Sequence, residues 1–352
     1  MKERMDGYLK RTVEKGATDL HLTAGRQPQL RIDGKLVLMD DKVLMPEEIE
    51  GLAFSILEDT QIGHFRAQKE LDTAYGLKGV GRFRINLFYQ RGSVGCAIRF
   101  IPFEVPRIEE LGLPSVLREF CGKSSGLFLV CGPTGCGKST TLAAMIKHIN
   151  YTQGCNIVTV EDPIEYLHKH NKATVNQREL GRDTHSFSEA LRHTVRQDPD
   201  VIMIGEMRDL DTMQAALTLS ETGHLVLATL HTVDAPNSIA RIVDVFPAYQ
   251  QQQIRLQLSL VLLGAIVQQL IPKRDGKGRI LAYELMKATP AVKNMIRENT
   301  LHQIYSVLQM GKGEGMMTMN QSLIELHRKN LITREEAIKR SPNPEELRRI
   351  VL

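Results

Sequence analysis

The stretch GLFLVCGPTGCGKSTTLAAMIKHIN (126–150) decides the fold. Residues 126–132 form an apolar run that is typical of a buried strand, and residues 138–150 space their apolar side chains as a helix does. Between them, GPTGCGKST (132–140) fits G-x-x-x-x-G-K-[ST], a pattern that binds phosphate when a strand precedes it and a helix follows it. Both neighbours are predicted here, so the sequence favours a phosphate-binding loop over a glycine-rich turn that binds nothing.

Each residue type in this loop has a chemical role. The glycines let the backbone bend so that successive N–H groups point at one phosphate, and the N-terminus of the next helix adds partial positive charge. Lys138 is expected to reach the β- and γ-phosphates of ATP, and the Ser139 hydroxyl to ligate Mg²⁺. The residues predicted to contact ATP or ADP are Gly132, Pro133, Thr134, Gly135, Cys136, Gly137, Lys138, Ser139 and Thr140.

The segments after this loop predict a parallel α/β sheet. Three more apolar runs, 156–160, 200–204 and 224–230, are separated by helical stretches. Strands joined by helical crossovers run parallel, and such sheets are covered on both faces. Another apolar run, LSLVLLGAIV (258–267), is too short to span a bilayer and is interpreted as part of a buried helix.

The first hundred residues predict a small mixed domain. Its expected elements are a helix over 1–15, strands over 19–40 with turns at Gly25 and Asp33-Gly34, a helix over 46–68, and two strands over 81–102 around a turn at Arg91-Gly92. Chain breakers at Pro106, Gly112 and Pro114 indicate a linker. The predicted limits are 1–105 for the N-terminal domain, 106–114 for the linker, 115–290 for the α/β core and 291–352 for a C-terminal helical region.

The composition is that of an ordinary globular protein. The 352 residues carry a formal net charge of only +4 and no dense Lys/Arg block, which does not favour a nucleic-acid partner. The five cysteines show no C-x-x-C spacing, and no signal peptide is recognised before them. We therefore expect a reduced, cytoplasmic protein with no structural zinc site and no transmembrane segment.

Carboxylates follow two of the predicted strands. EDPIE (161–165) comes after one apolar run, and GEMRD (205–209) after another. Ligands of parallel sheets gather at the carboxyl ends of the strands. Glu206 is therefore expected to support the Mg²⁺ shell through water, and Glu165, or else Glu161, to orient the attacking water. The alternative is that these glutamates form surface salt bridges.

Two further predictions concern residues beside these carboxylates. Gly205 is expected to leave room that a side chain would take from the nucleotide. If GHLVLATLHT (223–232) is extended, its histidine rings lie about 20 Å apart at ~3.3 Å per residue, so they cannot both touch one phosphate. His231, at the carboxyl end, is the candidate γ-phosphate sensor, and His224 is interpreted as structural or as part of an interface.

Arginines are the remaining ingredient of a phosphoryl-transfer site, which usually needs a mobile positive charge near the γ-phosphate. Arg82, Arg84, Arg91 and Arg99 crowd the last two predicted strands of the small domain. Most arginines are solvated surface residues. As a group, however, these indicate that the small domain closes over the nucleotide, with Arg82, Arg84 and Arg99 as the catalytic candidates.

Four motifs, in this order, resemble those of a known family. GPTGCGKST, VEDPIEY, IGEMRD and GHLVLATLHTVDA are similar to the Walker A, Asp box, Walker B and His box of the type II/IV secretion ATPases. Segments at both ends, among them GRFRINLFYQRG and TPAVKNMIRENTLHQIYSVLQMGKGEGMMTMNQSL, narrow the resemblance to the PilT-type ATPases, which power type IV pilus retraction in twitching motility.

The resemblance implies a PAS-like N-terminal α+β domain, a RecA-like P-loop domain with C-terminal helices, and a homohexameric ring. Glu206 and Glu165 fall on the Walker B and Asp-box carboxylates, and His231 on the second His-box histidine. AVKNMIRE (291–298) resembles a retraction motif written AIRNLIRE, and Lys293 replaces its arginine. The implied partner is the inner-membrane platform protein of the pilus machine, on which a cytoplasmic ring docks peripherally.

The leading interpretation is thus a motor that couples ATP hydrolysis to pilus retraction. The alternatives are a non-retracting secretion-ATPase relative, an accessory ring subunit, or a RecA-like nucleic-acid translocase, which the modest charge disfavours. Pilus-assembly relatives carry a tetracysteine zinc module and a long N-terminal extension, and the sequence shows neither.

Overall fold

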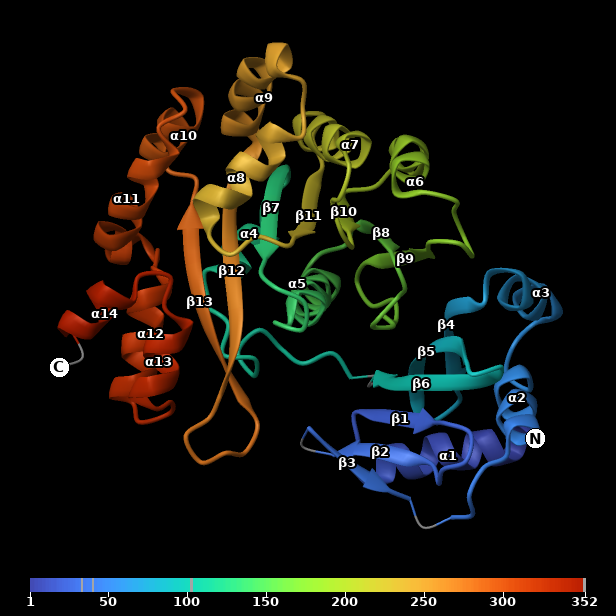
Figure 1. Cartoon of the computed structure of the whole chain (residues 1–352). Coiled ribbons are helices and arrows are strands. Elements are labelled where there is room, and N and C mark those ends of the chain that lie inside the picture. The colour runs from blue at the N-terminus through green and yellow to red at the C-terminus, as the bar shows by residue number, and fades with distance from the viewer. Residues whose placement is uncertain (33, 40, 102–103, 351–352) are drawn as a thin grey trace. The chain divides into compact units, whose positions relative to one another are not determined.

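The computed structural model describes residues 1–32, 34–39, 41–101 and 104–350, and the chain divides into two compact units. The first comprises Met1–Glu104 and Pro163–Leu167, and the second comprises Val105–Asp162 and His168–Leu352. Each unit contains a sheet with helices, so the mixed α/β fold class is confirmed (Figure 1). The predicted limits placed residues 163–167 in the core, whereas the structure groups them with the first unit.

The sheet of the first unit is antiparallel at every pairing that the structure describes and has the order β3-β2-β1-β6-β5-β4. Its strands are β1 (Asp19–Leu22), β2 (Gln29–Ile32), β3 (Lys35–Leu38), β4 (Glu70–Leu77), β5 (Gly81–Gln90) and β6 (Ser93–Ile101). Arg91 (φ 48°) and Gly92 (φ 79°) form the predicted β5–β6 turn, since a two-residue hairpin of this kind needs positive φ at both positions. The predicted turn at Asp33 lies outside the described residues.

The helices of the first unit are α1 (Lys2–Glu14), α2 (Pro46–Phe54) and α3 (Asp59–Gln68). The single helix predicted over 46–68 is therefore two helices. The second has its own start signal, because Gln61 Oε1 accepts a hydrogen bond from the Glu58 N–H at 3.0 Å, as in a capping box. The strand β4, which follows α3 directly, was not predicted.

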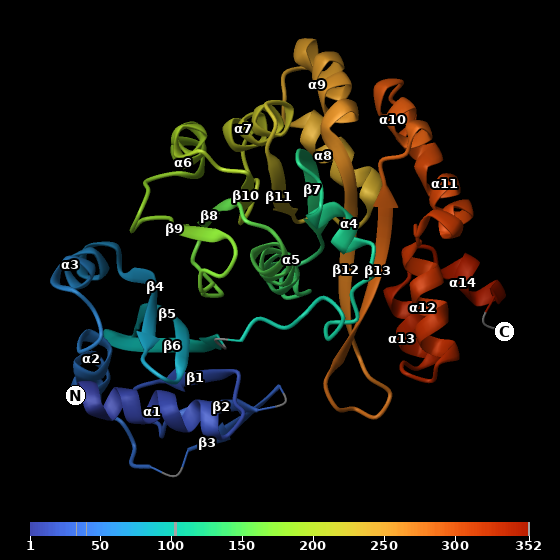
Figure 2. The same ribbon diagram turned by 180° about the vertical axis from the view of Figure 1, so that it is seen from behind.

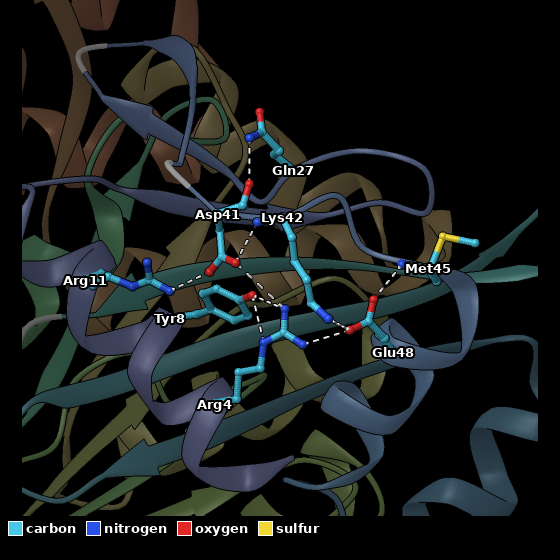
Figure 3. Close-up of polar contacts among 8 residues, drawn as sticks. All are labelled: Arg4, Tyr8, Arg11, Gln27, Asp41, Lys42, Met45 and Glu48. Carbon is cyan, nitrogen blue, oxygen red and sulfur yellow. Dashed lines mark hydrogen bonds and ion pairs between the residues drawn. The ribbon is translucent and has the colours of Figure 1, made fainter.

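A polar network ties α1 to the segment 41–48 (Figure 3). The Arg4 guanidinium donates to the Tyr8 hydroxyl (2.7 Å) and to Glu48 Oε1 (2.9 Å), and Arg11 donates to Asp41 Oδ2 (3.0 Å). Both guanidinium carbons lie over the Tyr8 ring, 5.4 Å and 4.9 Å from its centroid. Each arginine is thus paired with a carboxylate and packed on the Tyr8 ring. We interpret this network as a structural contact that holds α1 against the segment 41–48.

The sheet of the second unit has the order β13-β12-β7-β11-β10-β8-β9. β12 and β13 pair antiparallel, and the other neighbours pair parallel. The strands are β7 (Gly126–Cys131), β8 (Asn156–Glu161), β9 (Thr174–Glu179), β10 (Val201–Ile204), β11 (Leu225–Leu230), β12 (Leu262–Pro272) and β13 (Arg279–Lys287).

Helices cover both faces of this sheet (Figures 1 and 2). Phe128 and Val130 pack with α4 and α5 on one face, and Leu127 and Leu129 pack with α6 to α9 on the other, as the alternation of a strand requires. The helices are α4 (Leu117–Cys121), α5 (Lys138–Thr152), α6 (Phe187–Thr194) with a 3₁₀ turn at Val195–Gln197, α7 (Leu210–Glu221), α8 (Ala235–Asp244) and α9 (Ala248–Val261).

Short helices follow β13, as the polar-faced C-terminal pattern indicates. They are α10 (Pro290–Arg297), α11 (Ile304–Met310), α12 (Met319–Arg328), α13 (Arg334–Arg340) and α14 (Pro344–Ile350), with 3₁₀ turns at Leu301–Gln303 and Gly311–Glu314. Helices α12 to α14 share a small core with Ile271 of β12 and Ala282 of β13. None of the helices in the described ranges is both long and apolar enough to cross a bilayer.

The apolar run 258–267 is not one buried helix. Helix α9 ends at Val261, and β12 begins at Leu262. β12 lies between β7 and β13, and consecutive residues such as Ala265, Ile266 and Val267 are fully buried. A strand buried on both faces shows no polar alternation, so its sequence cannot be told from a buried helix by periodicity.

Candidate nucleotide site

The P-loop leaves β7 and opens α5 with the geometry that a phosphate requires. A Cβ on Gly132 (φ 138°) would lie 2.6 Å from both Cys136 Sγ and the Gln268 carbonyl oxygen, so only glycine fits there. Gly137 (φ 95°) is the N-cap of α5 and supplies no capping side chain. The first N–H groups of this helix therefore stay available to an anion, and this cradle fits a nucleotide phosphate.

Lys138 is held over the loop that it is predicted to serve. Its side chain is buried, and its ammonium donates to the carbonyl oxygens of Gly132 (2.8 Å) and Pro133 (3.2 Å). Ser139 lies half-buried on the same first turn of α5. Two residues after Ser139, the Thr141 hydroxyl accepts from Gln268 Nε2 of β12 at 2.8 Å. This hydrogen bond fixes α5 against the sheet.

The other predicted groups of this unit lie at the same edge of the sheet. β11 lies between β7 and β10, and the three strands run parallel. Their carboxyl ends therefore share one edge, and the P-loop, His231 and Glu206 follow them in that order. The sequence did not indicate that the histidine strand lies between the other two.

Glu206 is gripped by two basic side chains. Arg208 Nε lies 2.7 Å from Glu206 Oε1, and Arg208 Nη2 donates to Oε2 at 2.7 Å, a bidentate pair. His231 Nε2 lies 3.2 Å from Oε1. Burial by itself raises the pKa of the Glu206 carboxyl, but the Arg208 hydrogen bonds and the neighbouring His231 outweigh it, so the pKa lies below its ordinary value. Glu206 is thus an ionised, oriented carboxylate.

Gly205 has a packing role within the sheet, and the room that it was predicted to leave for a nucleotide stays a prediction. A Cβ there would lie 3.2 Å from the Val160 carbonyl oxygen and 3.3 Å from the Glu161 Cα, both in the neighbouring β8. The Gly205 N–H donates to the Val160 oxygen at 2.8 Å, and the Thr229 hydroxyl donates to the Gly205 oxygen at 2.6 Å. The glycine lets the end of β10 pack closely between β8 and β11.

The acidic segment after β8 is divided between the two units. Glu161 belongs to the second unit, and its buried carboxylate accepts from the Thr159 hydroxyl (2.7 Å) and Gln177 Nε2 (2.9 Å). These bonds hold the carboxylate against β8 and the neighbouring β9. Glu165 belongs to the first unit, with Pro163–Leu167. Its role in orienting water stays a prediction.

The predicted arginines share one face of the first unit's sheet. The β5–β6 register pairs Arg84 with Arg99, and Arg82 lies two residues from Arg84. Their side chains are therefore on the face opposite the buried Phe83. Arg99 Nε donates to Asp19 Oδ1 at 2.9 Å and remains largely exposed. Their action on a nucleotide stays a prediction.

His224 and His231 have separate environments, as their spacing predicts. His224 Nδ1 lies 2.9 Å from the carbonyl oxygen of Leu219 in the last turn of α7. This contact agrees with the structural interpretation of His224. His231, by contrast, follows the last residue of β11 and contacts Glu206.

Two arginines near the site were not singled out from the sequence. Arg208 lies two residues from Glu206 within the quoted motif, so a search for cations beside the carboxylate would have found it. Arg279 begins β13, and its Nη1 donates to the Gly135 carbonyl oxygen at 3.5 Å. It is 144 residues from Gly135, and no local pattern could have placed it at the P-loop.

The donor set fits a magnesium ion that arrives with a nucleotide. Within the described part of the chain there is no group of three or more His, Cys, Asp or Glu side chains that could hold a metal alone. Mg²⁺ bound to ATP keeps phosphate oxygens and waters as ligands and needs only one or two from the protein. The Ser139 hydroxyl and, through water, the Glu206 carboxylate are the groups that would provide them.

Comparisons with known proteins agree with this geometry. The family described as "Type II/IV secretion system protein" matches residues 108–339. The "Type IV pilus retractation ATPase PilT" of Pseudomonas aeruginosa is 46% identical over 95% of this chain and 97% of its own. The "Twitching motility protein" of Neisseria gonorrhoeae is 45% identical over 91% of this chain and 86% of its own.

A solved structure is similar over nearly the whole chain. The "Crystal Structure of the Pilus Retraction Motor PilT and Bound ADP" is 51% identical, covers 98% of both chains and superposes with a TM-score of 0.91. That motor binds ADP, which is consistent with the phosphate cradle described above. This chain therefore belongs to the type II/IV secretion ATPase family and is a homologue of its pilus-retraction members.

Proposed function

We propose that this chain is a Mg²⁺-dependent ATPase whose hydrolysis cycle drives retraction of type IV pili. One observation carries the enzymatic part of this proposal. At the edge of the sheet that carries the P-loop, Arg208 and His231 hold Glu206 ionised and in a fixed orientation. A purely nucleotide-binding protein needs the P-loop, but it does not need an oriented carboxylate beside it.

The residues of the second unit divide the work. Lys138 and the N-terminus of α5 bind the phosphates, and Ser139 would hold the Mg²⁺ that supplies further positive charge to them. Glu206 supports the Mg²⁺ shell through water, and its ionised carboxylate, oriented by Arg208 and His231, can also accept a proton from the attacking water. His231, in contact with Glu206, reports the state of the γ-phosphate side of the site.

The first unit supplies the remaining groups of this proposal. Glu165 orients the attacking water, and Arg82, Arg84 and Arg99 bring positive charge when the small domain closes. The common face of these arginines supports a joint role, because a sheet presents such a row to one ligand surface.

The assembly is proposed to be a homohexamer in the cytoplasm, docked peripherally on the inner-membrane platform protein of the pilus machine. The retraction-type motif supports a mechanical role for α10. Val292 and Ile296 are buried, and Lys293 Nζ donates to the Leu260 carbonyl oxygen in the last turn of α9 at 3.2 Å. Lysine is a single-point donor here and cannot make the bidentate contact that an arginine at this position could make.

The decisive enzymatic test is Glu206→Gln. We expect this variant to bind ATP as tightly as the wild type and to lose turnover by roughly 10³-fold, because it removes the proton acceptor and keeps the cradle. Glu325→Gln, a change at a partly exposed position of α12, is the control. Retained turnover in the Glu206 variant contradicts the assignment, and no turnover in the wild type favours the accessory-subunit alternative.

Retraction itself is tested in a bacterium that lacks its own retraction ATPase. The wild-type chain is expected to restore twitching, and the Glu206→Gln variant is not. Size measurement of the purified protein checks the hexamer. A chain that hydrolyses ATP but restores no twitching contradicts the retraction role and leaves the ATPase intact.

A further inference from the structure

Glu284 is a buried carboxylate at the start of two helices. It lies on β13 with 2% of its surface exposed. Its Oε1 accepts from the N–H of Ala235 at 2.8 Å, and the N–H of Met319 interacts with the carboxylate and favours its ionised form. Ala235 is the first residue of α8, and Met319 is the first residue of α12. One side chain therefore joins the N-termini of two helices that are far apart in the sequence.

The chemistry of this junction makes it stiff. Each helix N-terminus has unpaired N–H groups and partial positive charge, which a carboxylate satisfies. Among the described residues no cationic side chain forms an ion pair with Glu284. Only backbone N–H groups therefore stabilise the buried carboxylate. Pulling either helix away would leave a buried acceptor and a buried donor unpaired, which is costly. The two helices are thus held at a fixed separation.

On one side the junction is continuous with the nucleotide site. His231 is followed by a three-residue link to Ala235, and Asp234 is the N-cap of α8. The Thr232 hydroxyl lies 2.6 Å from the Ser238 hydroxyl, which fastens this link to the first turn of α8. This link is the path by which a displacement of His231 would reach the N-terminus of α8.

On the other side the junction is continuous with α12. Leu285 and Met317 exchange backbone hydrogen bonds of 2.8 Å and 3.1 Å, and the Tyr283 N–H donates to the Ser322 hydroxyl at 3.1 Å. Glu284 lies between these two contacts in the sequence. β13 is therefore bonded to the start of α12 and to the residue pair before it on both sides of Glu284.

The remaining C-terminal helices are attached to α12 by a second carboxylate. Glu346 of α14 accepts from Asn320 Nδ2 of α12 and from Gln309 Nε2 of α11, each at 2.6 Å, and from the Tyr305 hydroxyl of α11. α11, α12 and α14 therefore move together, and whatever shifts α12 shifts all three.

We propose that Glu284 is a positioning residue that transmits the state of the His231 loop to the C-terminal helices, through the N-termini of α8 and α12. The inference rests on the proposed ATPase function, because it needs a nucleotide-dependent displacement of His231. It adds the route by which that displacement leaves the site. The coupling is tested by perturbing the junction without touching the P-loop.

The experiment uses the full chain as wild type, Glu284→Ala, Glu284→Gln and the control Glu325→Gln. Glu284→Ala loses the hydrogen bond to Ala235 and the carboxylate that interacts with the Met319 N–H. Glu284→Gln retains one acceptor oxygen, and its NH₂ group cannot accept from the second helix. Hydrogen exchange of residues 316–323 is measured with and without Mg²⁺ and a slowly hydrolysed ATP analogue, together with kcat and KM for ATP.

We expect nucleotide to change the exchange of residues 316–323 in the wild type and in the control. This change should be lost in Glu284→Ala and reduced in Glu284→Gln, and kcat should fall about five- to tenfold with KM within about twofold. A merely structural role would lower stability without removing the nucleotide-dependent difference or splitting kcat from KM.

The proposal is overturned if a folded Glu284→Ala protein, which still binds the analogue, shows the wild-type change in exchange. If that variant does not fold, the same result in Glu284→Gln overturns it. Failure of the proposed function is distinguishable. A wild type without ATP turnover contradicts the function, whereas a wild type with turnover but no nucleotide-dependent exchange in 316–323 contradicts this inference alone.

Discussion

Glu206 follows β10 and Glu284 lies in β13, two strands of the same sheet. Their environments shift the pKa values of the two carboxyls in opposite directions. The Glu206 side chain is 20% exposed and is held by Arg208 and His231, and its pKa lies below the ordinary value. Glu284 meets only backbone donors in its described contacts. Burial raises its pKa to about 7; the N–H of Ala235 lowers it in part, the nearby Asp234 raises it, and the N–H of Met319 lowers it.

The difference shows how one residue type acquires two roles. A carboxylate that stays ionised at the carboxyl end of a parallel strand can act on a water. A carboxylate that resists ionisation inside the protein can hold backbone groups in place. Pairs of acids whose pKa values are driven apart by their surroundings are a general sign of divided duties.

The largest expected effect comes from removing Arg208, the cation that lowers the pKa of Glu206 and orients its carboxylate. Arg208→Ala should raise the pKa of Glu206 toward its ordinary value, loosen its orientation and lower kcat by roughly 10²- to 10³-fold. Arg208→Lys should give an intermediate loss, since lysine cannot form the bidentate pair. Steady-state kinetics measures both, with the exposed Arg328→Ala on α12 as the control. An unchanged kcat in Arg208→Ala would contradict the catalytic role assigned to the Arg208–Glu206 pair.

The pH dependence of stability should carry opposite signs at the two positions. Glu206, with a lowered pKa, contributes stability above its ordinary value of 4.5 that is lost as the pH falls through its folded pKa. Glu284, raised from 4.5 to about 7, contributes stability below pH 4.5 that is lost as the pH rises to about 7, on the order of 3 kcal/mol.

Thermal unfolding of the wild type, Glu206→Gln and Glu284→Gln between pH 4 and 8 checks these signs. The Tm of Glu284→Gln should rise relative to the wild type as the pH increases from 5 to 8. The Tm deficit of Glu206→Gln should stay constant over that range and shrink below about pH 4.5. Parallel curves for both variants would mean that the environments do not separate the two acids.

A smaller effect is expected at the histidine that contacts Glu206. His231→Ala removes one hydrogen-bond partner of an ionised carboxylate and should lower kcat about tenfold. His224→Ala is a matched control on the amino end of the same strand, where the ring contacts the end of α7. It should lower Tm and leave kcat unchanged. Equal kcat losses at both histidines would contradict the assignment of His231 to the site.

The smallest effect concerns the helix that Glu284 holds. Thr318 caps α12 through the Gln321 N–H at 3.2 Å, and Thr333 caps α13 through the Glu336 N–H at the same distance. Each Thr→Ala change should cost about 1 kcal/mol of unfolding free energy. In the Glu284→Gln background the cost of Thr318→Ala should increase and that of Thr333→Ala should not. Denaturant unfolding measures both; strict additivity at Thr318 would show that Glu284 does not support α12.

Local signals in the sequence were sufficient for the nucleotide cradle and for much of the sheet. The P-loop carries its own glycines, and a strand and a helix flank it as predicted. β8, β10 and β11 were recognised because each is a short apolar run between helical stretches. β9 (Thr174–Glu179) escaped because an edge strand can be polar, and TVNQRE is.

Long-range contacts explain what the sequence did not show. β12 was misread because burial on both faces removes its alternation. Arg279 reaches the P-loop only through the β12–β13 hairpin. Glu284 acquires its role from Ala235 and Met319, which lie in segments on either side of it, and no local pattern relates the three.

The chain passes between its two units at Glu104–Val105, at Asp162–Pro163 and at Leu167–His168. The first unit is therefore not one continuous stretch. Protease cleavage near residue 104 would separate Met1–Glu104 from the rest of the chain, while the 163–167 segment of the first unit would stay joined to the second unit. Any rotation of one unit against the other must also be absorbed by backbone dihedrals at each of these crossings, rather than by a single swivel. Glu165 lies in the 163–167 segment. The first unit therefore includes a carboxylate whose neighbours in the sequence on both sides belong to the second unit.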